Sequence, residues 1–227
     1  RQTGQSRPNV VLILADDLGR NDISLYSDSG VPTPHIDAMA DEGVVFTAAT
    51  CSSPICAPSR AGLLTGRHQQ RYGMETQPMA RYARNRLEYL GARVAFAGRD
   101  WVPVDTLRVP AAEQQRLQGL PPSEITIADM LQADGYATGC IGKWHVGTDT
   151  LFAPDRFGFD YHYGFYEAFS LYAPLDDTSI VNHRHDYFAS RHIWEQGRSG
   201  TCAIRRNRVE IDEPGYLTFR IAEEAKA

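Results

Sequence analysis

The feature that most limits the fold is an unbroken aliphatic run over residues 10–14, Val-Val-Leu-Ile-Leu, which ends two residues before a pair of carboxylates, Asp16 and Asp17. A continuous aliphatic run of strand length is typical of a central strand buried on both faces, as in parallel sheets. The run therefore predicts a buried strand that carries two acidic side chains at its carboxyl end.

A short helix is predicted over residues 34–42, with Thr33 as its N-cap and Gly43 as its stop. A second strand is predicted over residues 44–50, which are rich in Val, Phe and Thr. Strand, helix, strand is the pattern of an α/β fold, so we expect a mostly parallel sheet flanked by helices.

The same pattern recurs later in the chain. A capped helix is predicted from Ser123 or Thr126 to Ala133, with Gly135 as its stop, and a strand follows over residues 136–142. Lys143, Trp144 and His145 come directly after that strand. In open α/β sheets ligands bind outside the carboxyl ends of the strands. We therefore expect the acidic, thiol and basic groups that follow strands or precede helices to converge there, namely Asp16 and Asp17, Cys56 and Arg60, and Lys143 and His145.

Each of these groups also has an ordinary structural interpretation. Asp16 and Asp17 could form a turn or cap a helix, or their mutual repulsion could be offset by a hard cation, Ca²⁺ or Mg²⁺. Cys56, which comes just before a predicted helix over residues 57–65, could be a buried thiol or could form a disulfide with Cys51. His145 alone is typical of a structural histidine, and Lys143 alone of a surface charge.

Composition excludes some classes of protein. A net charge of −5 argues against a nucleic-acid-binding protein, and the longest apolar run is far shorter than a membrane span.

Residues 78–120 lack periodicity and are interpreted as an insertion. The Arg-rich stretch over residues 67–99 is either a solvated loop or a surface for an anionic substrate.

The motifs together resemble the type I sulfatase family, whose fold is that of alkaline phosphatase-like α/β enzymes. The segment CAPSRAGLLTG from Cys56 to Gly66 is similar to the family's C-x-P-S-R motif, in which the cysteine is oxidised to formylglycine. The first predicted strand with Asp16 and Asp17, the helix that follows it and the Gly-Lys-Trp-His segment resemble further family segments in the family's order. The resemblance covers most of residues 8–166 apart from the insertion.

The resemblance implies a sulfuric ester hydrolase. Formylglycine at Cys56 would be the nucleophile, Arg60 would orient it, and His145 would act on its hydrated form. Lys143 would bind the sulfate, and Asp16, Asp17 and residue 56 would bind Ca²⁺, with Mg²⁺ as an alternative. Implied partners are a sulfated small molecule or polysaccharide, and a formylglycine-generating or anaerobic sulfatase-maturing enzyme. We expect a periplasmic or secreted location.

Residues 1–227 are expected to form the N-terminal part of a single catalytic domain that is incomplete at its C-terminus. The family's later half contributes an Asp-Asn metal pair, a second lysine and an acid histidine, and this chain has no Asp-Asn dipeptide. We therefore expect little turnover from the chain alone. The alternatives are a phosphatase or phosphodiesterase of the same superfamily, and a non-catalytic fragment of a nicked or degenerate enzyme.

Overall fold

A computed structural model describes residues 7–28, 31–75, 77, 87, 118–180 and 197–227. The chain divides into two compact units, residues 1–50 and residues 51–227, and each is described by itself. Most of the predicted insertion over residues 78–120 lies outside the described residues.

The first unit is built around one predicted helix. Its elements are η1 (Arg20–Asp22), η2 (Ser24–Tyr26) and α1 (Pro34–Glu42). The predicted bounds of α1 are confirmed, with Thr33 before its first residue and Gly43 after its last. The start of α1 is fixed by Ser24, whose Oγ donates to Asp37 Oδ2 at 2.6 Å and accepts from the Thr33 backbone N–H at 2.8 Å.

The prediction of two strands in this unit is wrong, because the structure contains neither of them. Residues 10–14 and 44–50 form no regular strand, and Val11, Val44 and Phe46 are 82%, 80% and 75% exposed. A strand is stabilised by hydrogen bonds to a neighbouring strand. Among the described residues of this unit, extended segments pair only in the isolated bridge between Ile23 and Val31. Aliphatic composition alone therefore does not create a strand here.

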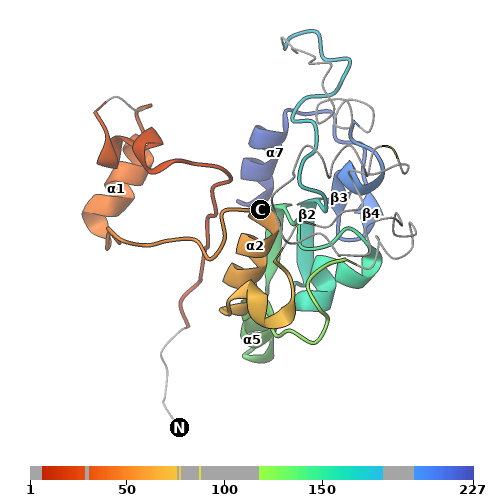
Figure 1. Ribbon diagram of the computed structural model, residues 1–227. Helices are drawn as coiled ribbons and strands as arrows, with labels where there is room; N and C mark the ends of the chain where they lie inside the picture. Colours follow the sequence, from red (N-terminus) through yellow and green to blue (C-terminus); the bar gives the residue numbers. More distant parts are fainter. Residues whose placement is uncertain (1–6, 29–30, 76, 78–86, 88–117, 181–196) are drawn as a thin grey trace. The chain divides into compact units, whose positions relative to one another are not determined.

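The second unit contains the sheet and the helices packed on it (Figure 1). Its helices are α2 (Cys56–Thr65), η3 (Gln69–Tyr72), α5 (Ile127–Ala133), η5 (Thr150–Phe152), η6 (Pro154–Phe157), η7 (Gly200–Cys202) and α7 (Leu217–Glu224), and its strands are β1 (Gly139–Lys143), β2 (Tyr161–Phe165), β3 (Arg205–Arg206) and β4 (Val209–Glu210). The predicted helix before β1 is confirmed with Thr126 as its cap, because the Thr126 side chain accepts from the Asp129 N–H and Asp129 Oδ2 accepts from the Thr126 N–H. None of the described helices combines the length and the apolar character needed to cross a membrane.

The described strands form one mixed sheet in the order β1-β2-β3-β4. β1 and β2 are parallel, with Gly139 opposite Tyr161 and Lys143 opposite Phe165, whereas β2 with β3 and β3 with β4 are antiparallel. The predicted α/β class is confirmed, but the described sheet is mixed rather than mostly parallel, because only β1 and β2, at the strand that leads into Lys143, pair in parallel.

Two separate cores lie on the two faces of this sheet. Cys140 packs into a cluster with Ala57 and Ala61 of α2, while the next residue, Ile141, packs into a cluster with Leu217 of α7. Successive residues of a strand point to opposite faces, so α2 and α7 cover opposite faces of the parallel pair.

Two glycines bring β1 and β2 together immediately before Lys143. Gly142 and Gly164 are paired in register, and both have positive φ, 103° and 150°. A Cβ on Gly164 would lie 1.9 Å from the Gly142 carbonyl oxygen, which is closer than any side chain allows. This close approach fixes the carboxyl ends of both strands.

Candidate active site

The residue predicted to be the nucleophile is the first residue of α2. Ile55 is extended, with φ −113° and ψ 138°, and its carbonyl oxygen accepts the first helical hydrogen bond from the Ser59 N–H at 3.0 Å. Pro58 lies in the first turn, where its missing N–H has no intrahelical partner to lose. The helix ends at Gly66, whose φ of 63° is readily adopted by glycine.

Small residues hold this helix close to the preceding segment. Ala57, Pro58, Ala61 and Gly62 of α2 are buried, and a Cβ on Gly62 would lie 2.4 Å from Ser52 Oγ. The small residues of the motif therefore have a packing role that fixes the start of α2.

The Cys56 thiol is half-buried and accepts a hydrogen bond from Gln77 Nε2 at 3.1 Å. It is a free cysteine, and so is the exposed Cys51, so the structure does not contain the disulfide left open by the sequence. A group at the first position of a helix also lies beside N–H groups and the positive end of the helix dipole, which favour anions. The position therefore suits a nucleophile that attacks an anionic ester.

Arg60 lies one turn along α2 from Cys56, on the same face of the helix. Its Nη1 donates to the Lys143 carbonyl oxygen at 2.8 Å, across a separation of 83 residues in the sequence. This hydrogen bond joins the motif helix to the carboxyl end of β1. The Arg60 side chain thus lies beside the Lys143 backbone, while the expected convergence of the Cys56 and Lys143 side chains stays a prediction.

Lys143 is the last residue of β1, and His145 follows two residues later. His145 has φ 58°, is 1% exposed, and its backbone N–H donates to the Tyr166 carbonyl oxygen at 3.1 Å. A left-handed conformation is unfavourable for a non-glycine residue and is often found at functional sites. The segment is held in this conformation by its neighbours.

Trp144 is the main anchor of that segment. It is 2% exposed, its Nε1 donates to the Phe152 carbonyl oxygen at 2.6 Å, and its ring contacts those of Phe157 and Phe159 at centroid distances of 5.8 Å and 5.7 Å. The buried indole therefore fixes the backbone from which the Lys143 and His145 side chains extend.

A second thiol lies near the same arginine. Desolvation raises the pKa of Cys140 to about 12, against a smaller opposing effect of the Arg60 charge. Since only the thiolate is strongly nucleophilic, this raised pKa disfavours Cys140 as a nucleophile. Cys140 is therefore not expected to compete with residue 56 as the nucleophile.

Asp16 and Asp17 belong to the first unit, where both are exposed and Asp17 has φ 56°. Their carboxylate oxygens are hard donors of the kind that Ca²⁺ and Mg²⁺ prefer. Among the residues that the structure describes, no group of three or more His, Cys, Asp or Glu gathers to hold a metal ion. The predicted approach of Asp16 and Asp17 to Cys56 stays a prediction.

Gln77 is a neighbour of the predicted nucleophile that the sequence did not indicate. It falls in the Arg-rich stretch, 21 residues after Cys56, and belongs to no motif. No sequence signal marks a glutamine that will donate to a distant thiol, because the contact depends on how the loop after α2 folds back.

Comparison with known proteins gives a consistent result. A family model described as Sulfatase matches residues 8–193. The chain is 38% identical over 164 residues to Arylsulfatase D of Homo sapiens, and 40% identical over 159 residues to Steryl-sulfatase of Mus musculus. These matches cover 70% and 67% of this chain, but 23% and 21% of the two relatives. The chain therefore spans less than a quarter of the length of these two relatives.

Solved structures give a similar picture. The crystal structure of Ps i-CgsB matches with a TM-score of 0.68 at 27% identity, covering 97% of this chain and 40% of that one. The same protein in complex with k-i-k-neocarrahexaose matches with a TM-score of 0.67.

Proposed function

The chain belongs to the sulfatase family, and from this premise we propose that it is the part of a sulfuric ester hydrolase that carries a formylglycine nucleophile at position 56. The hydrogen bond from Arg60 Nη1 to the Lys143 carbonyl oxygen, at 2.8 Å, is the observation that carries the proposal. It places the helix that begins with Cys56 beside the segment that supplies Lys143 and His145.

The residues of this chain match the demands of sulfate ester hydrolysis. Once converted and hydrated, residue 56 would present one hydroxyl to attack sulfur and a second whose deprotonation releases sulfate as the aldehyde re-forms. Because the ester is anionic, its attack needs positive charge around the sulfate oxygens. The start of α2 and the cations of Arg60 and Lys143 supply that charge.

His145 is the residue of this chain suited to hold the proton of the second hydroxyl. Its backbone is fixed by the hydrogen bond to Tyr166 and its side chain is buried, so the imidazole has a defined position. Gln77 Nε2 positions the group at residue 56 by donating to it. These two roles need no residue outside the second unit.

Asp16 and Asp17 would hold Ca²⁺ or Mg²⁺ through their carboxylate oxygens, and the bound ion would add positive charge beside the sulfate. Two carboxylates supply only part of the roughly six to eight oxygen ligands of Ca²⁺. We therefore place the remaining ligands in the longer protein of which this chain is the N-terminal catalytic part.

A sulfated carbohydrate is the substrate class that we propose, and the relative in complex with k-i-k-neocarrahexaose supports it. The conversion of Cys56 requires a maturing enzyme as partner, and we place the protein in the periplasm or outside the cell. A leader-dependent export assay in the native cell checks this location.

The mass of the peptide that contains residue 56 is the decisive measurement. Protein made in cells with a maturing enzyme should show the mass of an aldehyde at Cys56, and the full-length enzyme should release sulfate from a sulfated oligosaccharide. Cys56→Ser should stop after one turnover with sulfate bound to the serine, because it lacks the second hydroxyl. An unmodified thiol, together with release of phosphate instead of sulfate, would point to a phosphatase or phosphodiesterase.

A further inference from the structure

A buried histidine of β2 has ring nitrogens that bond to no other described group. His162 is 2% exposed, and neither its Nδ1 nor its Nε2 has a hydrogen-bond partner among the residues that the structure describes. Its backbone is held by Asn207, whose Oδ1 accepts from the His162 N–H at 2.9 Å and whose N–H donates to the His162 carbonyl oxygen at 2.7 Å. Leaving a buried polar group without a partner costs free energy, so such a group calls for an explanation, and a bound ligand is one.

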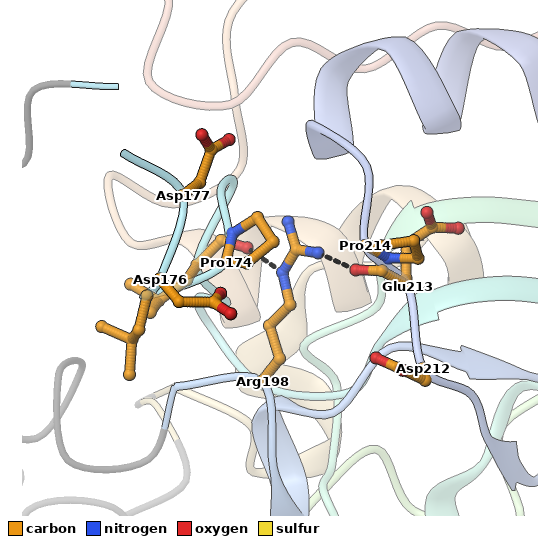
Figure 2. A pocket seen from close by; sticks show the side chains of 9 residues that line it. Pro174, Asp176, Asp177, Arg198, Asp212, Glu213 and Pro214 are labelled. Carbon is orange, nitrogen blue, oxygen red and sulfur yellow. Dashed lines mark hydrogen bonds between the residues drawn. The ribbon is translucent and has the colours of Figure 1, made fainter. Parts of the chain in front are cut away.

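The pocket shown in Figure 2 lacks this signal. Arg198 lies across it, where its Nε donates to the Leu171 carbonyl oxygen at 2.8 Å and its Nη1 donates to the Glu213 carbonyl oxygen. The Glu213 carboxylate in turn accepts from the Gly215 N–H at 3.0 Å. These groups are bonded within the protein, whereas the ring nitrogens of His162 are not.

A free thiol lies opposite this histidine on the neighbouring strand. Cys140 of β1 and His162 of β2 are paired in register. Residues directly opposite each other on neighbouring strands point to the same face of the sheet, and the strands lie about 5 Å apart. Cys140 is a partly buried free cysteine that packs against the cluster formed by α2 and Trp144. An ion between the thiol and the imidazole can therefore reach both.

The remaining residues of this face leave the imidazole nitrogens available. Gly142 and Gly164, the next pair in register, have no side chains to bond to them. The ring centroid of Tyr166 lies 5.3 Å from that of His162, but the Tyr166 hydroxyl donates to the Asn207 carbonyl oxygen at 3.2 Å. The polar group nearest to the imidazole ring along the strand is thus bonded elsewhere.

Positive charge already lies near the pair. The Arg60 charge acts on the Cys140 thiol. The Arg205 charge acts on the His162 imidazole more strongly than the opposing charge of Asp155. Burial is the main cause that lowers the pKa of His162 to about 4, and the Arg205 charge adds to it. The imidazole is therefore neutral at neutral pH, and one of its nitrogens has a free lone pair.

We propose that Cys140 and His162 form a two-coordinate binding site for a soft monovalent cation of the copper(I) and silver(I) class. The Cys140 S–H loses its proton to solvent as the sulfur bonds the ion, and the neutral imidazole nitrogen of His162 forms the second bond. No electron is transferred. The thiolate charge balances the charge of the ion, so the occupied site is neutral, which is the state that burial favours.

Divalent ions fit this site less well. Structural zinc sites take four ligands, and among the described parts of the chain no group of three or more His, Cys, Asp or Glu gathers. A divalent ion with one thiolate would also leave a net positive charge in a buried place that already feels the Arg60 and Arg205 charges. Ca²⁺ and Mg²⁺ prefer oxygen ligands. The site therefore differs in its chemistry from the Ca²⁺ site proposed at Asp16 and Asp17.

The experiment uses the whole chain with Cys51→Ala and Cys56→Ala, which removes the exposed thiol and the proposed nucleophile and leaves Cys140 and Cys202. Silver(I) nitrate in chloride-free buffer is the probe, because silver(I) shares the charge and the soft ligands of copper(I) and is stable in air. Isothermal titration should show about one strong site per chain. Nitrogen-15 NMR should show a shift of the His162 ring resonance on binding. Because Cys56 is absent, the result is independent of the proposed function.

Three variants of that chain locate the site. Cys140→Ser should abolish strong binding, and His162→Gln should weaken it by about tenfold or more, because the thiol remains while the second ligand is lost. Cys202→Ala removes the other buried thiol and should leave the affinity unchanged.

Strong binding that survives Cys140→Ser, or an affinity that is equal in His162→Gln and the parent chain, would overturn the proposal. An unshifted His162 resonance in the silver-loaded parent would do so without any variant, which keeps the test decisive where a variant does not fold. A strong zinc site in the same chain would also contradict it.

Discussion

The hydrogen bond between Arg60 and Lys143 leads to a quantitative prediction for Arg60→Met. The variant keeps the length and the apolar stem of the side chain but removes the donor that bonds the Lys143 carbonyl oxygen at 2.8 Å. A hydrogen bond to a charged group contributes roughly 1.5–3 kcal/mol, and both residues here are half-buried. We therefore expect the free energy of unfolding to fall by about 2 kcal/mol, which corresponds to a Tm lower by about 4–8 °C for a chain of this length.

Thermal unfolding of the two proteins, followed by far-ultraviolet circular dichroism, measures this difference. Arg67→Met is the matched control, since Arg67 follows the end of the same helix and forms an exposed ion pair with Glu124. Such surface pairs contribute at most about 1 kcal/mol. Equal Tm values for Arg60→Met and Arg67→Met would refute the view that the Arg60 bond holds α2 to the end of β1.

Three further changes test other parts of the structure. Gly164→Ala should lower the Tm far more than Gly139→Ala. A Cβ at Gly164 would lie 1.9 Å from the Gly142 carbonyl oxygen, whereas one at Gly139 would have no atom within 4 Å. Equal effects on the Tm would contradict the close approach of β1 and β2. Burial lowers the pKa of His162 to about 4, whereas the pKa of histidine in the unfolded chain is near 6.5. The free energy of unfolding should therefore fall as the pH drops below about 6.5. Urea titrations should show a decrease of about 2 kcal/mol between pH 7 and pH 5. That dependence should shrink in His162→Gln and persist in His68→Gln, which changes an exposed histidine. Gln77→Leu should slow the alkylation of unconverted Cys56 by about fivefold, because the thiolate loses a hydrogen-bond donor. Peptide mass mapping measures the rate. An unchanged rate would show that the 3.1 Å hydrogen bond does not form in solution.

The sequence by itself determined the helices whose ends carry local signals. α1 lies between Thr33 and Gly43, and α5 begins after Thr126, as their capping residues predicted. α2 begins at Cys56, one residue before the predicted start. These boundaries follow from hydrogen bonds and backbone preferences of residues a few positions apart, so a short window of sequence contains the necessary information.

The sequence also placed Lys143 at the end of a strand and His145 just beyond it, and the structure agrees. It predicted no strand in the region where the structure forms the hairpin of β3 and β4. Asn207, with φ 56° in the turn between those strands, is the signal that could have found it.

Only the tertiary structure decided which segments become strands and which side chains meet. The aliphatic run over residues 10–14 has the composition of a strand but no neighbouring strand among the described residues of its unit, and strand formation requires such a neighbour. The contacts of Gln77 with Cys56, of Arg60 with Lys143 and of Arg198 with its carbonyl acceptors join residues far apart in the chain. Their geometry depends on how whole elements pack, which no local pattern of residues encodes.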